Sequence, residues 1–122
     1  MVDELLDSGR KLIEKLDYLK VAPETAYWEL VDDLVWKLKL YSSKYFSIGA
    51  KKMYQKIQRI LEEEDLAIDL TDISIVDPFD QTRKAINMMI STGDGIGNFR
   101  MTNNIVNGYL IKDIMLYRSN PA

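Results

Sequence analysis

Apolar residues near the start of the chain recur at the spacing of a helix face. Between residues 3 and 20 they follow one another at steps of three or four positions, which places them on one side of an amphipathic helix. Pro23 suits the first turn of a second helix, and a longer apolar stripe continues from there. The pattern therefore predicts helices over residues 3–20 and 23–46. The stripe of the second helix comprises Tyr27, Leu30, Leu34, Leu38, Tyr41 and Tyr45.

The same spacing predicts three further helices. One begins after Ser47 or Gly49 and ends near residue 64, another covers residues 77–91, and the last covers residues 102–117. Short connections between consecutive helices favour antiparallel neighbours that pack as a bundle.

Residues 66–76 depart from helical spacing. Leu66, Ile68 and Leu70 alternate with other residues, and the alternation resumes at Ile73 and Ile75. This pattern predicts a short strand or hairpin that packs on the helices, because a lone hairpin is marginally stable in water. The predicted fold class is therefore mostly α, and α+β only by this small β element. The architecture expected is an antiparallel bundle of about five helices.

Composition limits the chemistry open to the chain. Its 122 residues are the length of one domain, residues 1–122, and 47% of them are hydrophobic, as in folded proteins. The chain contains no cysteine and no histidine, which excludes thiolate chemistry, disulfides, histidine catalysis and the usual zinc sites. We expect no cofactor and no bound metal. The lack of cysteine is in keeping with the cytoplasm or another reducing intracellular compartment.

The hydrophobic pattern does not indicate a membrane protein. No stretch approaches 18 uninterrupted apolar residues, and the first residues are acidic and polar. We therefore expect neither a membrane span nor a signal peptide.

The net charge of −3 conceals a segregation of charge along the chain. Residues 34–61 contain seven bases and no acid, whereas residues 62–80 contain eight acids and no base. Blocks of this size give the surface a strong dipole if they lie on different faces. Two interpretations remain open: the blocks pair with each other, within the fold or in an oligomer, or the bases face a partner that carries phosphates.

Tyrosines lie among the bases of the first block. Basic side chains with exposed aromatic rings bind single-stranded nucleic acid through phosphate attraction and base stacking. Tyr41, Tyr45 and Tyr54 also belong to the apolar stripes, however, so the lysines alone need be exposed. The candidate nucleic-acid-binding residues are Lys37, Lys39, Lys44, Lys51, Lys52, Lys56 and Arg59.

The segment Asp77-Pro78-Phe79-Asp80 has the composition of a helix start. Aspartate is a strong N-cap, proline is pre-organised for the first helical position, and a further aspartate favours the positive end of the helix dipole. Together with Asp72, the two aspartates are also an alternative cation site, because Mg²⁺ needs few carboxylates. Nothing in the spacing of these aspartates is specific to a metal site.

Three glycines, Gly93, Gly95 and Gly97, form a second candidate site. Glycine-rich loops that precede helices cradle phosphate with backbone amides. The spacing here matches neither the dinucleotide-binding fingerprint nor the P-loop. A helix stop followed by a loop is the alternative, with Gly93 just past the end of the helix.

Residues 66–110 contain a resemblance to a known family. "ISIVDPFDQTRKAINMMIS" resembles the helical region that follows the catalytic domain in poly(A), terminal uridylyl and oligoadenylate-synthetase-like nucleotidyltransferases. Asp77, Pro78, Phe79, Asp80 and Thr82 carry the match, and "GNFRMTNNIVNGYL" is similar to the next helix. Lys84 replaces the family's asparagine, and the catalytic half has no counterpart in this chain. The resemblance implies a substrate-side module detached from its nucleotidyltransferase.

Binding rather than catalysis is the function that the sequence favours. Nothing in it matches a known catalytic motif, so we predict no catalytic residue. The leading hypothesis is a helical module that works through protein–protein contacts, in an oligomer or a larger complex, with the charge blocks setting complementarity. The alternatives are a nucleic-acid-binding accessory factor that uses residues 37–59, and the nucleotidyltransferase-like module.

Overall fold

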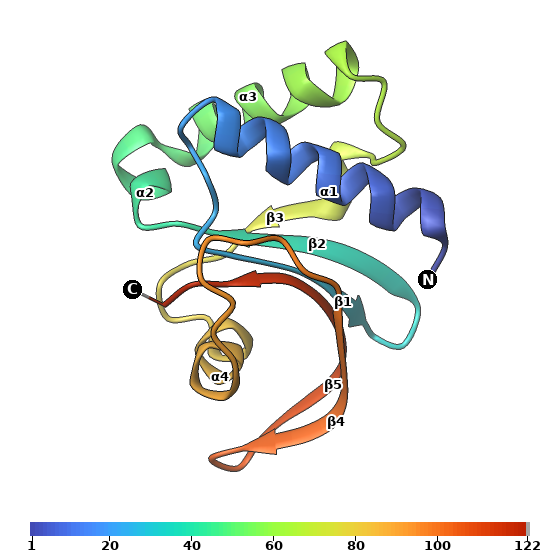
Figure 1. Cartoon of the computed structure of the whole chain (residues 1–122), viewed down its shortest axis with the longest axis vertical. Helices are drawn as coiled ribbons and strands as arrows, with labels where there is room; N and C mark the ends of the chain where they lie inside the picture. Colours follow the sequence, from blue (N-terminus) through green and yellow to red (C-terminus); the bar gives the residue numbers. More distant parts are fainter. Residues whose placement is uncertain (122) are drawn as a thin grey trace.

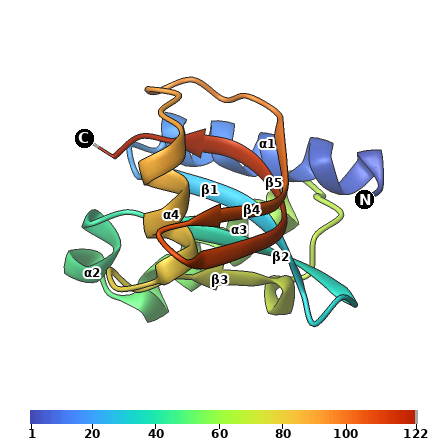
Figure 2. The same ribbon diagram turned by 90° about the horizontal axis from the view of Figure 1, so that it is seen from below.

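A five-stranded mixed sheet with helices on both faces organises the molecule (Figures 1 and 2). The computed structural model describes residues 1–121. The strand order is β3-β2-β1-β5-β4, and all neighbours are antiparallel except the parallel pair β2–β3. In chain order the elements are α1 (Asp3–Tyr18), β1 (Thr25–Val31), β2 (Val35–Tyr41), α2 (Lys44–Ile48), α3 (Ala50–Glu63), the 3₁₀ turn η1 (Leu70–Asp72), β3 (Ile73–Ile75), α4 (Gln81–Met89), β4 (Phe99–Val106) and β5 (Tyr109–Ser119).

This α+β fold shows that the predicted five-helix bundle is wrong. The predicted helix over residues 23–46 is instead mostly the β1–β2 hairpin. Asp32 and Asp33 reverse the chain with φ of +54° and +56°, a conformation that aspartate tolerates better than most residues. Strand β1 is buried on both faces near its start, so apolar residues fall at helical as well as alternating positions.

The predicted helix over residues 102–117 is also wrong, because these residues form the β4–β5 hairpin. Asn107 and Gly108 occupy its turn with φ of +48° and +79°, both in the left-handed region that a tight hairpin turn requires. Asn103 interrupts β4 with a φ of +52°. Apolar residues on both faces of this hairpin produced the apparent helical stripe.

Three predicted helices do exist, as α1, α3 and α4. Helix α4 begins later than predicted, since its N-cap is Asp80, whose side chain accepts a hydrogen bond from the Arg83 amide. The predicted β element at residues 66–76 is reduced to η1 and the edge strand β3, which extends the sheet beside β2. Within residues 1–121, no helix combines the length and apolar character needed to cross a bilayer.

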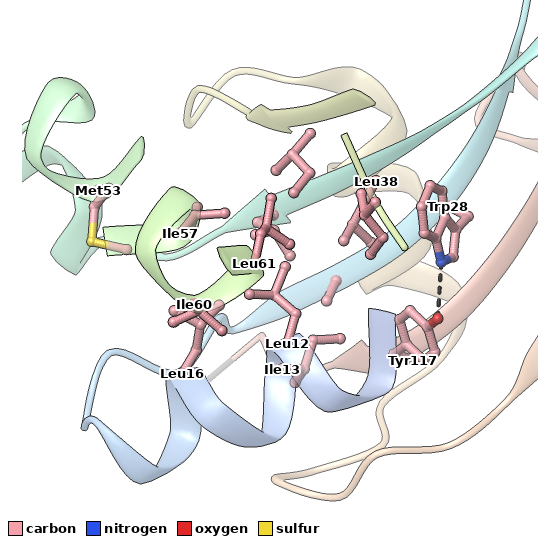
Figure 3. Close-up of a cluster of buried hydrophobic side chains, with 14 of the residues drawn as sticks. Leu12, Ile13, Leu16, Trp28, Leu38, Met53, Ile57, Ile60, Leu61 and Tyr117 are labelled. Atoms are coloured by element: carbon pink, nitrogen blue, oxygen red, sulfur yellow. Dashed lines mark hydrogen bonds between the residues drawn. The ribbon is translucent and has the colours of Figure 1, made fainter. Parts of the chain in front are cut away.

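Helices α1 and α3 close one face of the sheet (Figure 3). Trp28 lies at the end of this cluster, where its Nε1 donates a 2.9 Å hydrogen bond to the Tyr117 hydroxyl. That hydroxyl donates in turn to the Leu6 carbonyl at 2.6 Å, and burial raises the pKa of Tyr117 to about 12. The core on this face includes Leu12, Ile13 and Leu16 of α1, Met53, Ile57 and Ile60 of α3, and Leu38 and Leu40 of β2.

Helix α4 covers the opposite face less completely. Ala85 and Ile86 pack against Tyr27 of β1 and against Ile111, Ile114 and Leu116 of β5. The β4–β5 hairpin extends past the end of β1 and curves around the side on which α4 lies (Figures 1 and 2). This curvature leaves an open surface between α4 and the β4–β5 hairpin.

Candidate functional site

The N-terminus of α4 lies over β1 and is fixed there by Asp80. One Asp80 carboxylate oxygen, Oδ2, accepts from the Arg83 amide at 2.9 Å and from the Tyr27 hydroxyl at 3.1 Å. The aspartate that starts the helix therefore also joins it to the centre of the sheet.

A second polar contact links α4 to both neighbouring strands. The Thr82 hydroxyl lies 3.3 Å from Glu29 Oε2 on β1 and 2.5 Å from the Tyr109 hydroxyl at the start of β5. Thr82 can donate its one hydroxyl proton to Glu29 while it accepts from Tyr109. Two groups of hydrogen bonds, Tyr27–Asp80 and Glu29–Thr82–Tyr109, therefore lie beneath the first turn of α4, and together they are called the polar network.

The network holds Glu29 in an environment that disfavours its charge. Burial raises the pKa of Glu29, Lys39 opposes this rise, Asp80 adds to it, and the Thr82 hydrogen bond opposes it. Burial, with Asp80 and Glu29 nearby, raises the pKa of Tyr27 as well. A carboxyl whose pKa is raised by burial at the edge of a pocket is a common feature of functional sites.

Two pockets lie on either side of Tyr109. The apolar pocket, of about 390 Å³, lies between α4 and the hairpin turn and includes Phe79, Ala85, Met88 and Val106. The acidic pocket, of about 530 Å³, lies between the β1–β2 turn and the start of β5. Its charged lining residues are Glu29, Asp32, Asp33, Asp113, Lys39 and Lys112.

Some charges of the acidic pocket already have partners. Lys112 lies 3.9 Å from Asp33, and Arg100 forms a two-point ion pair with Asp113. Within residues 1–121, no ion pair within 4.0 Å involves Glu29 or Asp32. The pocket therefore offers two carboxylates to a cationic group.

Bulky apolar side chains surround the apolar pocket and remain in water. Phe79 is 78% exposed and Met88 is 63% exposed, and both line this pocket. Ile105, 70% exposed, pairs across the hairpin with Leu110, but neither residue lines this pocket. A single exposed apolar residue needs no explanation, but a group of them around a pocket indicates a binding surface.

The structure divides the predicted basic site among several surfaces. Lys37 and Lys39 alternate with the buried Leu38 and so lie on the sheet face away from α3. Lys37 Nζ donates to the Thr71 carbonyl at 3.0 Å and pairs with Asp72 at 3.3 Å. Lys39 lines the acidic pocket and Lys44 lies on α2. The remaining bases, Lys51, Lys52, Lys56 and Arg59, share the outer side of α3.

The loop of Gly93, Gly95 and Gly97 connects α4 to β4 rather than to a helix. Its carbonyls accept hydrogen bonds from two arginines: Arg118 donates to Gly95 at 3.3 Å, and Arg10 donates to Gly97 at 3.2 Å. The Gly97 amide donates to the Tyr117 carbonyl at 2.7 Å. Protein groups thus occupy the Gly95 and Gly97 carbonyls and the Gly97 amide, and phosphate binding by this loop stays a prediction.

Asp72, Asp77 and Asp80, the alternative cation site of the sequence, each contact a different protein group. Asp77 Oδ1 accepts from the Phe79 amide at 2.7 Å, Asp80 joins Tyr27, and Asp72 pairs with Lys37. In the part of the chain that the structure describes, no three acidic side chains gather as metal ligands would.

Sequence reasoning missed the polar network at the centre of this site. Its members come from β1, α4 and β5, which are distant in sequence and meet through the sheet order. One signal was available: Tyr27 and Glu29 alternate on a strand whose other face carries Trp28.

Comparisons with models of protein families, with curated proteins and with solved structures found no match to this chain. The resemblance to nucleotidyltransferases therefore stays a prediction.

Proposed function

We propose that this protein is a non-catalytic binding module whose partner is a segment of another protein, held between α4 and the β4–β5 hairpin. The group of exposed apolar side chains around a pocket on this side carries the proposal. Met88 on α4 and Phe79 in the turn before α4 are largely exposed and line one pocket together with Val106 of β4. Burial of such side chains by a partner is favourable at roughly 25 cal/mol per Å² of apolar surface.

The chemistry of the two pockets defines the kind of segment that fits. A bulky apolar side chain would fill the space beside Met88, whose flexible thioether adapts to different shapes. A lysine or arginine a few residues away would cross Tyr109 and approach Glu29 and Asp32. A cation beside Glu29 would favour its charged form, which burial now disfavours.

We also propose that this protein works in a reducing intracellular compartment. Disulfides rarely form there, and this chain contains no cysteine with which to form one. Like the binding itself, this placement is a proposal.

Peptide display on the purified full chain tests the proposed function. We expect the selected peptides to combine a bulky apolar residue with a nearby lysine or arginine. Phe79→Ala and Met88→Ala should each weaken binding of a selected synthetic peptide by about tenfold, since a well-buried anchor contributes more than 1 kcal/mol. Fluorescence anisotropy with the labelled peptide measures the change.

Tyr18→Ala is the matched control, because Tyr18 is 77% exposed, as Phe79 is at 78%, but lies on α1. It should leave peptide affinity unchanged. All three variants should retain stability within about 0.5 kcal/mol, since they alter exposed positions. Selected peptides without an apolar residue, or full binding by the Phe79→Ala and Met88→Ala variants, would refute this function.

A further inference from the structure

The outer side of α3 has an uneven arrangement of charge. Lys51, Lys52, Lys56 and Arg59 are exposed along its first ten residues, and Glu62 and Glu63 are exposed at its end. Glu64 and Asp65 follow directly and are also exposed. The helix therefore presents a positive half followed by a negative half.

Few of these charges are paired within the molecule. Glu64 lies 3.7 Å from Lys15 of α1. In the described range, residues 1–121, none of the four bases has a carboxylate within 4.0 Å, and Glu62, Glu63 and Asp65 have no base within that distance. The basic block of residues 34–61 and the acidic block of residues 62–80 are instead joined by the ion pair between Lys37 and Asp72, which lies on another surface.

The order of charge on α3 opposes the stability of the helix itself. The positive end of a helix dipole lies at the N-terminus, so acids are favourable in the first turn and bases in the last. The first turn of α3 contains no acid and its last turn contains no base. Charges placed against a local rule point to a role outside the isolated helix.

We propose that the outer side of α3 joins two copies of this chain, with their α3 helices antiparallel. A two-fold axis near Arg59 and Glu62 would set Arg59 of each copy against Glu62 of the other. The same axis would set Lys56 against Asp65, which lies directly past the end of α3. The two helix dipoles would also be antiparallel, and one self-complementary patch would serve both copies.

A shallow pocket on this face supplies apolar surface for the contact. It measures about 530 Å³ and includes Tyr54, Gln55, Arg59, Glu62 and Leu70. Tyr54 is fixed in position, because its hydroxyl accepts a 2.9 Å hydrogen bond from the Ile75 amide. Arg59 and Glu62, which lie at the proposed axis, line this pocket, whereas Lys52 and Lys56 lie further around the helix and do not line it.

The acidic half of α3 favours a second copy over a nucleic acid as the occupant. A phosphate backbone attracted to Lys52 and Lys56 would continue toward Glu62, Glu63 and Asp65, where like charge repels it. A second copy instead presents an acid to each base. Exposed ion pairs are individually weak and screened by salt, so the dimer should be strongly salt-dependent.

Charge reversal with mass measurement tests the dimer. Sedimentation velocity of the wild-type chain should show a monomer–dimer equilibrium at 50 mM NaCl that weakens at least tenfold at 500 mM NaCl. Lys56→Glu with Arg59→Glu, and separately Glu62→Lys with Asp65→Lys, should each weaken self-association at least tenfold. An equimolar mixture of these two variants should form a heterodimer, because each supplies the charge that the other now lacks.

Lys84→Glu with Lys112→Glu is the matched control. It makes the same change in net charge as Lys56→Glu with Arg59→Glu, but on the α4 side of the sheet, and should leave the dimer unchanged. All altered positions are exposed, so circular dichroism should show an unchanged fold. Peptide binding at Phe79 and Met88 should persist in every α3 variant. Failure of the dimer proposal can therefore be distinguished from failure of the proposed peptide-binding function.

Three results would overturn the proposal: a monomer at every concentration up to 1 mM, a dimer indifferent to salt, or a mixture that fails to associate. Titration with a 20-nucleotide single-stranded RNA tests the alternative, in which a nucleic acid binds the outer side of α3. If the wild-type monomer binds this RNA and Lys56→Glu with Arg59→Glu abolishes the binding, the surface is a polyanion site.

Discussion

The two faces of the sheet differ in how completely they are covered. Within residues 1–121, the face beneath α1 and α3 has a cluster of fifteen buried apolar residues, whereas the face beneath α4 has six. On the first face one hydroxyl, that of Tyr117, joins Trp28 to the Leu6 carbonyl. On the second, Glu29 and Tyr27 share a polar network and Phe79 and Met88 remain in water.

This difference places most of the buried core on one face of the sheet and the proposed binding surface on the other. The face closed by two helices removes most of the apolar surface from water and so provides most of the favourable folding energy. The face with α4 keeps apolar side chains exposed and holds a carboxyl whose charge is disfavoured. Substitutions should therefore affect the two faces differently.

The largest expected effect is the loss of a buried isoleucine. Ile57 of α3 and Ile86 of α4 are both fully buried, and truncation to alanine typically costs about 2–5 kcal/mol. We expect Ile57→Ala to reduce the free energy of unfolding more than Ile86→Ala, because the larger cluster surrounds Ile57 on more sides. Urea denaturation measures both losses. An equal or greater loss for Ile86→Ala would break the comparison of the two faces.

Gly9→Ala should give an intermediate effect. By helix propensity alone, alanine would stabilise an exposed helix by about 1 kcal/mol. Here a Cβ at Gly9 would collide with the Tyr117 hydroxyl and lie 3.0 Å from Trp28 Nε1. We therefore expect a net loss of about 1–3 kcal/mol, the usual cost of overpacking a core.

Trp28 fluorescence reports this change directly, since its Nε1 hydrogen bond to Tyr117 would be displaced. An increase in the stability of Gly9→Ala would contradict this prediction, because it would show that α1 can move away from Tyr117 without a loss of packing energy.

Glu29→Gln should give the smallest effect, and that effect should depend on pH. Burial raises the folded-state pKa of Glu29 above its ordinary value of 4.5, so the folded chain binds a proton more readily than the unfolded chain. The resulting stability is present below pH 4.5 and is lost as pH rises through the folded-state pKa. Glutamine does not ionise, so the variant should lack this loss.

Urea denaturation at pH 4, 5, 6 and 7 checks this prediction. The variant should gain on the wild type as pH rises, by less than about 1 kcal/mol, since Glu29 is partly exposed to solvent. A difference that stays constant with pH would mean that the carboxyl of Glu29 is not disfavoured on folding.

The sequence predicted helices well where one face alone is apolar. Helices α1 and α3 each present a single stripe to the core, which is the pattern that helical periodicity detects. Helical periodicity gave the wrong prediction at β1 and at the β4–β5 hairpin, because apolar residues on both faces of these strands also fall at three- and four-residue spacing. The alternation of Trp36, Leu38 and Leu40 with lysines, and the pair Asn107-Gly108, were the local signals that should have outweighed it.

The candidate site was less predictable than the helices, because it depends on sheet order. Asp80 could be identified as a capping residue from its neighbours, but its contact with Tyr27 spans 53 positions. The bond of Thr82 to Tyr109 requires a hairpin that the sequence pattern did not indicate. The charge blocks are visible in the sequence, whereas the division of the basic residues between α3 and the α4 side of the sheet depends on the strands.

The left-handed backbone of Asn103 bears on how this protein behaves when concentrated. Strand β4 is an edge strand of eight residues, and an unbroken edge of that length templates the addition of further strands from other molecules. Asn103 divides it into two short segments that cannot present a continuous row of amides and carbonyls. We therefore expect concentrated solutions of this protein to resist the slow, irreversible growth of fibrils.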